Sequence, residues 1–283
     1  MNEYNNKDLF LLSNQLRKEI IDISYKSKAH HIGSEFSCID LLTSLFFNYI
    51  DLEPNNFLSS KRDWFMIGKG HASLAYYVIL SKKGFFSIDD LVKNFLKDGG
   101  LLGGHPDKSV MPGIDINSGS LGHSLSIASG IALAAKKDDT KRKSFVLLGD
   151  GECNEGMIWE SALFSAQHKL DNLIAIVDLN GLQGLGRTEE VISLQSLPLK
   201  FESFGWNVQE IDGHDFSEIN ESFKSCGMVK NKPNIIIAKT IKGKGARSME
   251  DTLKSHYETL TKERYEEVSN EINDYIKENM PNL

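Results

Sequence analysis

Residues 145–156, FVLLGDGECNEG, and residues 172–183, NLIAIVDLNGLQ, decide the fold of this chain. Each stretch contains an apolar run, and each run leads to a side chain that offers oxygen: Asp150 after the first and Asn180 after the second. Residues 155–169 between the two runs resemble a helix. Two strands joined by a helix predict a parallel pair, and an open parallel sheet binds its ligands at the carboxyl ends of its strands.

The oxygen atoms of Asp150 and Asn180 favour a metal-bridged diphosphate site. Mg²⁺ is commonly held by one or two carboxylates while substrate phosphates complete its shell, and Gly149 and Gly151 allow a close approach of the backbone. Taken singly, Asp150 would be explained as a helix cap and Asn180 as a turn residue. A nucleotide site is the main alternative. However, no G-x-G-x-x-G motif follows a strand here, and the sequence contains no G-x-x-x-x-G-K-[ST] motif.

Composition limits the possible partners. The chain has 283 residues, of which 40% are hydrophobic and 25% charged, and its net charge is -7. It lacks the basic surplus that nucleic acids or acidic membranes require. Its three cysteines form no Cys-x-x-Cys pair, and no apolar run approaches the ~20 residues that span a bilayer. We therefore expect a cytoplasmic protein that binds neither nucleic acid nor membrane.

The rest of the chain alternates between short apolar runs typical of buried strands and apolar residues at helical spacing. A long glycine-rich stretch, residues 99–122, has few periodic apolar residues, and such loops are usually functional. No repeat or linker divides the chain, so we predict a single domain over residues 1–283. The pattern predicts an α/β fold with a mostly parallel sheet flanked by helices. Further strands are predicted over residues 63–67, 206–211 and 234–240, and helices over residues 9–23, 38–49, 88–96, 124–135 and 260–276.

Histidines form a second group of candidate site residues. Several in loops at one sheet edge would suit a site that binds hydroxyls or phosphates and moves protons. His30 and His168 lie in helical or helix-end surroundings and are interpreted as structural. The Gly-Lys-Gly at residues 243–245 could meet a phosphate or form a solvated turn. Four histidines stand close to glycines: His31, His71, His105 and His123.

Taken together, the motifs of this chain resemble the N-terminal part of transketolase, the thiamine-diphosphate enzyme that moves two-carbon ketol units between sugars. The resemblance runs from about Leu9 to His256 and keeps the order of the family's motifs. Those motifs are KAHHIGSEFSCIDLL (28–42), RDWFMIGKGHASLAYY (62–77), LLGGHPD (101–107), PGIDINSGSLGHSL (112–125), LLGDGECNEGMIWE (147–160), NLIAIVDLNGLQ (172–183), FGWNVQEIDGHD (204–215) and IIAKTIKGKGARSME (236–250).

The resemblance implies a thiamine-diphosphate-binding fold and a cofactor site. Asp150, Asn180 and the carbonyl of Leu182 would bind Mg²⁺ or Ca²⁺ on the diphosphate, and Gly151 would give the cofactor room. His71 would lie near the diphosphate. The family pattern also assigns backbone contacts with the cofactor rings to Gly119 and Leu121.

The resemblance also implies substrate and dimer contacts. His31, His105 and His256 would line the substrate channel, bind sugar hydroxyls and shuttle protons. Glu155 and Glu160 resemble glutamates that link paired sites, which implies self-association across the cofactor site. Two stretches depart from the family pattern: Gly-Gln-Gly is Gly-His-Ser at residues 122–124, and Trp-His-Gly is Ser-His-Tyr at residues 255–257.

The length of the chain departs most from the family. A full transketolase continues into two further domains, which supply the carboxylate that activates the cofactor and the arginines that grip the sugar phosphate. The resemblance therefore implies a split enzyme whose partner is a C-terminal transketolase subunit, in an α2β2 assembly acting on sugars or sugar phosphates. Three alternatives stay open: a split enzyme of a specialised sugar pathway, a diphosphate-binding subunit of a 2-oxoacid decarboxylase, and a catalytically silent module that binds cofactor or partner.

Overall fold

The computed structural model describes residues 4–280 and contains one five-stranded sheet in the order β1-β2-β3-β5-β4. Every neighbouring pair of strands is parallel, which confirms the predicted fold class. In a parallel sheet all carboxyl ends lie at one edge, so this sheet has a single ligand-binding edge. The strands are β1 (Trp64–Ile67), β2 (Ser144–Gly149), β3 (Leu173–Leu179), β4 (Asn207–Asp212) and β5 (Asn234–Lys239).

The central strands are apolar throughout because both faces of the sheet are covered. On β2, Phe145 and Leu147 belong to one hydrophobic cluster, whereas Val146 and Leu148 belong to the other. Successive strand residues point to opposite faces, so a strand buried on both sides has a continuous apolar run instead of an alternating one. This explains why residues 145–148 and 173–177 mark the centre of the fold.

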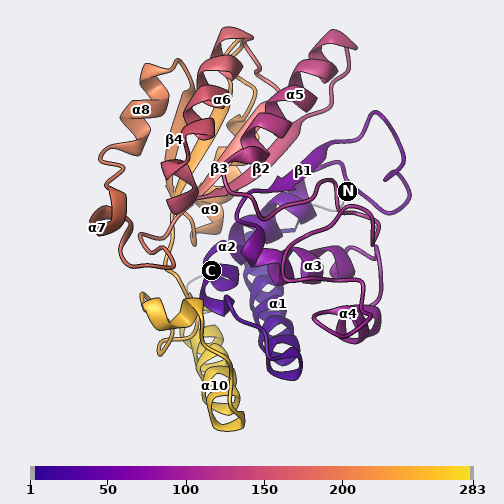
Figure 1. Ribbon diagram of the computed structural model, residues 1–283, viewed down its shortest axis with the longest axis vertical. Coiled ribbons are helices and arrows are strands. Elements are labelled where there is room, and N and C mark those ends of the chain that lie inside the picture. The colour runs from indigo at the N-terminus through magenta and orange to yellow at the C-terminus, as the bar shows by residue number, and fades with distance from the viewer. Residues whose placement is uncertain (1–3, 281–283) are drawn as a thin grey trace.

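Helices pack on both faces of the sheet and make three layers (Figure 1). Helices α5 (His123–Lys137), α6 (Gly156–Gln167) and α8 (Leu197–Ser203) cover one face. The short α7 (Thr188–Ile192) follows β3. The opposite face carries α1 (Asn6–Ser27), α2 (Ile32–Ser44), α3 (Ser73–Lys82), α4 (Ile88–Asn94), α9 (Phe216–Ser225) and α10 (Lys262–Asn279).

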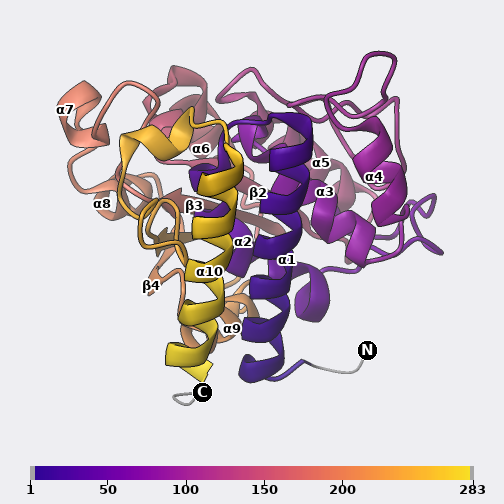
Figure 2. The same cartoon turned by 90° about the horizontal axis from the view of Figure 1, so that it is seen from below.

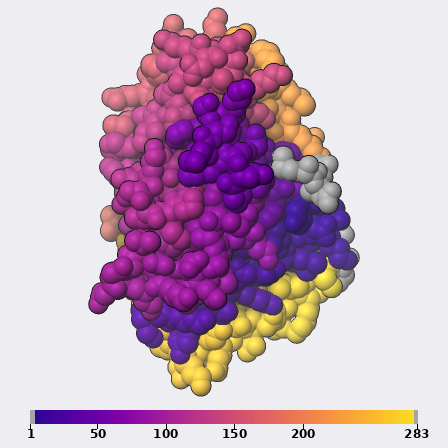
Figure 3. Space-filling model, turned by 90° about the vertical axis from the view of Figure 1, so that its right-hand side faces the viewer, coloured from indigo at the N-terminus to yellow at the C-terminus, as the bar shows by residue number. Residues whose placement is uncertain are grey.

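The first and last helices lie side by side although they are far apart in the sequence (Figure 2). Tyr265 of α10 stacks on Tyr25 of α1, with ring centroids 4.9 Å apart. Figure 3 shows the face on which residues 95–122 spread out in magenta and the segment before β1 stands out in violet. Within residues 4–280, no helix is both long and apolar enough to cross a membrane.

Most predicted elements are present with shifted ends. The helix predicted over residues 38–49 begins earlier, at Ile32, and its last turn, Leu45–Tyr49, is a π-helix. The glycine-rich residues 99–122 form no named helix or strand, as predicted. Three short 3₁₀ turns near the sheet edge, Gly70–Ala72, Gly151–Asn154 and Leu253–His256, contain candidate site residues.

Candidate functional site

Asp150 lies directly after β2, and its carboxylate ties this strand end to the next one. One oxygen accepts a hydrogen bond from the Gly151 N–H at 2.7 Å. The other accepts from the Gly181 N–H at 2.7 Å and from the Thr188 hydroxyl at 2.9 Å. The residue is 3% exposed. Burial, and then the nearby Asp178 carboxylate, raise the pKa of Asp150.

The loop after β3 brings two further oxygen atoms to the same edge, the side-chain oxygen of Asn180 and the carbonyl oxygen of Leu182. The Asn180 side-chain oxygen accepts from the Leu182 N–H at 3.1 Å, while its amide nitrogen donates to Asp178 at 3.2 Å. Because Gly149 and Asp178 are register partners in the β2–β3 pair, Asp150 and Asn180 follow adjacent strands. Their shared bonds to residues 178–182 place Asp150, Asn180 and Leu182 at one site.

A buried ion pair between Lys69 and Asp178 stabilises this edge of the sheet. The Lys69 ammonium contacts the Asp178 carboxylate and also donates to the Ser34 carbonyl at 3.0 Å. The Ser37 hydroxyl donates to Asp178 at 2.6 Å, and the Thr240 hydroxyl bonds to its second oxygen. Burial alone would raise the pKa of Asp178, but the Lys69 charge and these bonds lower it. Asp178 is therefore a charged anchor beneath the Asn180 loop.

Three histidines from distant segments form a cluster beside this edge. The ring centroids of His31, His71 and His256 lie 5.0 to 5.3 Å apart. His31 has φ 73°, in the left-handed region, which directs the chain into α2. Burial and the neighbouring positive charges lower the pKa of His31 to about 4 and that of His256 to about 3. All three rings are neutral at pH 7, since the pKa of His71 is also lowered by burial.

Lys242 joins the histidine cluster to the strand-end loop. Its ammonium donates to the Leu182 carbonyl at 3.2 Å and to His256 Nδ1 at 2.8 Å. Because the ammonium has no lone pair, Nδ1 of His256 accepts and its Nε2 carries the proton. Burial and the charge of Lys69 lower the pKa of Lys242 to about 8. Lys242 thus remains a cation at pH 7 and fixes the His256 tautomer.

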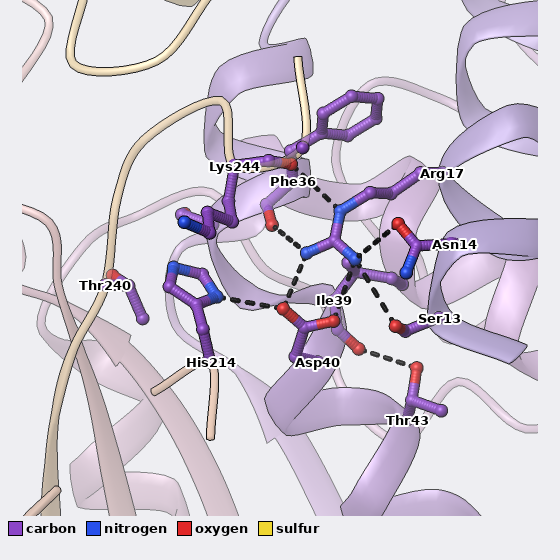
Figure 4. A network of polar contacts seen from close by, with 12 residues as sticks. Ser13, Asn14, Arg17, Phe36, Ile39, Asp40, Thr43, His214, Thr240 and Lys244 are labelled. Atoms are coloured by element: carbon purple, nitrogen blue, oxygen red, sulfur yellow. Dashed lines mark hydrogen bonds and ion pairs between the residues drawn. The ribbon is translucent and has the colours of Figure 1, made fainter. Parts of the chain in front are cut away.

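A polar network holds the loop that carries Lys242 (Figure 4). The His214 Nε2 accepts a hydrogen bond from the Ile241 N–H at 2.9 Å, so its Nδ1 donates to Asp40 at 2.8 Å. Arg17 grips both oxygens of Asp40, at 2.8 and 2.6 Å, and donates to the Lys244 carbonyl at 2.9 Å. Helices α1 and α2 are therefore tied to the backbone on both sides of Lys242.

Glu152 connects the strand end to the start of α5. Its carboxylate accepts from the Gly122 N–H at 2.9 Å and from the Gly149 N–H at 3.1 Å. It is 2% exposed, and burial raises its pKa to about 7. A Cβ on Gly68 would lie 2.5 Å from both carboxylate oxygens, so this contact requires glycine at residue 68.

These groups surround a cavity of about 400 Å³, which falls in the size range of small-molecule sites. Its lining includes the strand-end residues Asp150, Asn180 and Leu182, together with His71, His256 and Lys242. Ser34 lines it as well, although its hydroxyl oxygen is buried. The cationic Lys242 beside oxygen-rich walls suits a ligand that carries phosphate and a metal ion.

The profile of the family described as the transketolase thiamine diphosphate binding domain matches residues 8–274. The chain belongs to the transketolase family. It is 44% identical over 271 residues to an apulose-4-phosphate transketolase subunit of Phocaeicola vulgatus, with 95% of each chain covered. It is also 38% identical to the 6-deoxy-6-sulfo-D-fructose transketolase subunit SqwG of a Clostridium species, with 91% of this chain and 94% of that one covered.

Solved transketolases confirm the fold and show how much of a full enzyme this chain represents. The transketolase of Campylobacter jejuni superposes with a TM-score of 0.89 at 31% identity, covering 95% of this chain but 43% of that one. The chain thus spans less than half of the solved transketolases, whereas it spans nearly all of the transketolase subunits. It therefore corresponds to the N-terminal part of a full transketolase, and its relatives favour ketol transfer over 2-oxoacid decarboxylation.

The transketolase fold brings most of the predicted site residues together. His105 lies against Gly119, where a Cβ would approach its ring to 3.2 Å. Leu121, Gly151 and Glu155 line the cavity with the strand-end residues. Glu160 is exposed on α6. His123 does not join the histidine cluster: it is exposed at the start of α5, and its Nδ1 lies 3.1 Å from the Ser120 hydroxyl.

The sequence interpretation missed several residues of the site. Lys69 and Lys242 do not stand out in the sequence, because a lysine beside glycines resembles a solvated turn; only the Gly-Lys-Gly at residues 243–245 suggested a phosphate contact. Its Lys244 contacts Glu250 and the Tyr275 ring instead, outside the cavity. Cys153 beside Asp150 is fully buried, and burial raises its thiol pKa. The remaining missed residues are Ser34, Glu152, Asn154, Gln183, Gly184, Val191, Ile192 and Tyr257.

Proposed function

We propose that this chain anchors the diphosphate of thiamine diphosphate through a divalent metal ion and transfers two-carbon ketol units together with a C-terminal partner subunit. The observation that carries the proposal is the cavity that the paired strand ends share with His71 and His256, the two histidines whose rings contact His31. We further propose that residues 1–283 act as one diphosphate-binding domain, in line with the family match over residues 8–274.

The donor set fits a hard divalent cation. Asp150, the Asn180 side-chain oxygen and the Leu182 carbonyl are all oxygen ligands, which Mg²⁺ and Ca²⁺ prefer. Lys242 would meet the diphosphate oxygens, with His71 beside them. The backbone at Gly119 and Leu121 would contact the cofactor rings, and Gly151 would give the diphosphate room.

Bound thiamine diphosphate would supply the carbanion chemistry that cleaves and forms the ketol bond. The residues of this chain would bind and orient the sugar. Since Lys242 occupies Nδ1 of His256, the Nε2–H of that ring is available to donate to a sugar oxygen. His31 is neutral at pH 7 and can donate or accept a proton. His105 would complete the channel beside Gly119.

The names of the relatives support a proposal for the partner and the substrates. Two transketolase subunits of similar length carry names that refer to apulose 4-phosphate and to 6-deoxy-6-sulfo-D-fructose. We therefore propose an α2β2 enzyme of a specialised sugar pathway that acts on a ketose phosphate or a related ketose. Self-association would occur across the cofactor site, where Glu155 lines the cavity and Glu160 is exposed.

Isothermal titration of thiamine diphosphate into the chain with its partner subunit, with and without Mg²⁺, tests this proposal. We expect binding that depends on the metal and weakens when a chelator is present. Ca²⁺ should replace Mg²⁺ if the oxygen donors alone select the ion. Absence of binding in the presence of both metal and partner would favour a catalytically silent module.

A further inference from the structure

Tyr257 stands at the mouth of the cavity, on the solvent side of the histidine cluster. Its ring centroid lies 4.5 Å from that of His256 and 6.1 Å from that of His31. Tyr257 is 58% exposed, whereas the adjacent His256 is 8% exposed. The neutral imidazole of His256 is therefore buried, whereas the phenol ring of the next residue, Tyr257, is exposed to solvent.

The backbone at Tyr257 is tied down at two points. The Tyr257 carbonyl accepts a hydrogen bond from His30 Nδ1 at 2.9 Å, and the His256 carbonyl accepts from the His31 N–H at 3.0 Å. These bonds connect the segment to the residues that start α2. The ring of Tyr257 therefore stands on a fixed backbone at the cavity mouth.

The hydroxyl of Tyr257 lies close to Gly184, another residue that lines the cavity. A Cβ built on Gly184 would lie 2.4 Å from this hydroxyl oxygen, so the phenol closes against the loop that carries Leu182. Within residues 4–280 the hydroxyl takes part in no hydrogen bond. A phenol hydroxyl both donates and accepts, so this one is available to a ligand that enters the cavity.

We propose that Tyr257 recognises a hydroxyl group of the acceptor aldose and thereby determines the acceptor selectivity of this subunit; the inference rests on the proposed ketol transfer. The reacting carbons would lie at His31 and His256, and the rest of the acceptor chain would extend toward the mouth, past Tyr257. Hydroxypyruvate has only a carboxylate beyond its two-carbon ketol unit, so we expect this donor not to reach Tyr257. Tyr257 is a specificity residue, since it stands outside the reacting atoms.

Steady-state kinetics of the complex with its partner subunit test the proposal, with hydroxypyruvate as donor. D-glyceraldehyde and propanal serve as matched acceptors, because they differ in their hydroxyl groups. Tyr257→Phe should raise KM for D-glyceraldehyde roughly threefold to tenfold, the effect of one hydrogen bond. KM for propanal and for hydroxypyruvate should stay within about twofold of wild type. Equal effects on both acceptors, or no effect on either, would overturn the proposal.

Gly184→Ala provides a second and independent variant. The new Cβ would displace the Tyr257 hydroxyl, so this variant should show the same loss of selectivity as Tyr257→Phe. In the Tyr257→Phe background the nearest atom of residue 257 would be the ring carbon, 3.3 Å away. Gly184→Ala should then add little, whereas two fully additive losses of selectivity would contradict the shared cause.

Thiamine diphosphate affinity separates recognition from a structural role. Tyr257→Phe should bind the cofactor as tightly as the wild-type complex; a loss of affinity would assign the residue to folding or cofactor binding and overturn the proposal. If the wild-type complex transfers no ketol unit to either acceptor, the proposed function itself fails. Transfer by the wild type with unchanged selectivity in the variants refutes only the role of Tyr257.

Discussion

The Asp150 carboxylate accepts a hydrogen bond from the Gly181 N–H at 2.7 Å, so the end of β2 is bonded to the loop after β3. This bond orients the carboxylate toward the Asn180 side, where the other oxygen donors stand. A single side chain thereby shapes the loop and is the proposed ligand of the metal ion.

Asp150→Ala should abolish metal-dependent retention of thiamine diphosphate in the complex. The change removes the proposed ligand and leaves the Gly181 N–H and the Thr188 hydroxyl without this acceptor, at a cost of about 1–3 kcal/mol in stability. Cofactor retained after gel filtration with Mg²⁺ is the measurement. Asp98→Ala, at an exposed loop residue, is the control. Unchanged retention by Asp150→Ala would rule out the metal assignment.

Gly68→Ala should destabilise the chain by about 1–3 kcal/mol. The new methyl group would lie 2.5 Å from the Glu152 carboxylate, which the Gly122 and Gly149 N–H groups hold in place. Gly130→Ala is the matched control, because its Cβ meets nothing within 4 Å inside α5 and should stabilise by about 0.5–1 kcal/mol. Urea denaturation of both variants measures the difference, and equal midpoints would contradict the close contact.

Asp40→Asn should cost about 3–5 kcal/mol, because it leaves the buried Arg17 charge without its counter-ion. The loop that carries Lys242 should loosen as well, since His214 loses its carboxylate partner. Asp251→Asn breaks an exposed ion pair with Arg187 and should change stability by less than about 1 kcal/mol. Thermal unfolding compares the two variants; a similar small loss for Asp40→Asn would refute the role of the network.

Stability should fall as pH drops below 6.5 because of the histidine cluster. Burial and nearby positive charges lower the pKa of His31 to about 4, against about 6.5 in an unfolded chain. Between these values the unfolded state binds a proton that the folded state does not, so stability is full above pH 6.5 and declines toward pH 4.

The variant His31→Asn should reduce the slope of Tm against pH between 5 and 6.5. Asparagine tolerates the left-handed backbone at this residue, where φ is 73°. His168→Asn, at an exposed histidine, should keep the wild-type slope. An unchanged slope in His31→Asn would show that the cluster does not produce the pH dependence.

The strand ends could be predicted because apolar runs buried on both faces stand out in a sequence. Asp150 and Asn180 were recognised from the residues that end those runs, and the parallel register confirms that they follow adjacent strands. The glycine context indicates His31 and His71, but His256 needed the family resemblance, since the three rings meet only through tertiary packing. A neighbouring glycine is not sufficient to identify a site histidine, because His123 follows Gly122 and yet lies outside the cluster.

The two lysines could not be found from local patterns. Lys69 is buried against Asp178, which lies 109 residues further along the sequence. No local pattern can indicate such a distant partner. Lys242 enters the cavity because β5 pairs with β3 and because Arg17 and His214 hold the loop after β5. Tyr257 follows a histidine that the family pattern identifies, but only the fold brings its hydroxyl against Gly184.

Ketol transfer by the purified chain, alone and with its C-terminal partner subunit, tests the central claim most directly. Hydroxypyruvate, an aldose acceptor, thiamine diphosphate and Mg²⁺ are supplied in both assays. We predict transfer by the complex and none by the chain alone, since the proposed diphosphate site lies in this chain, which spans 43% of a solved transketolase. Full activity of the chain without a partner would contradict the account.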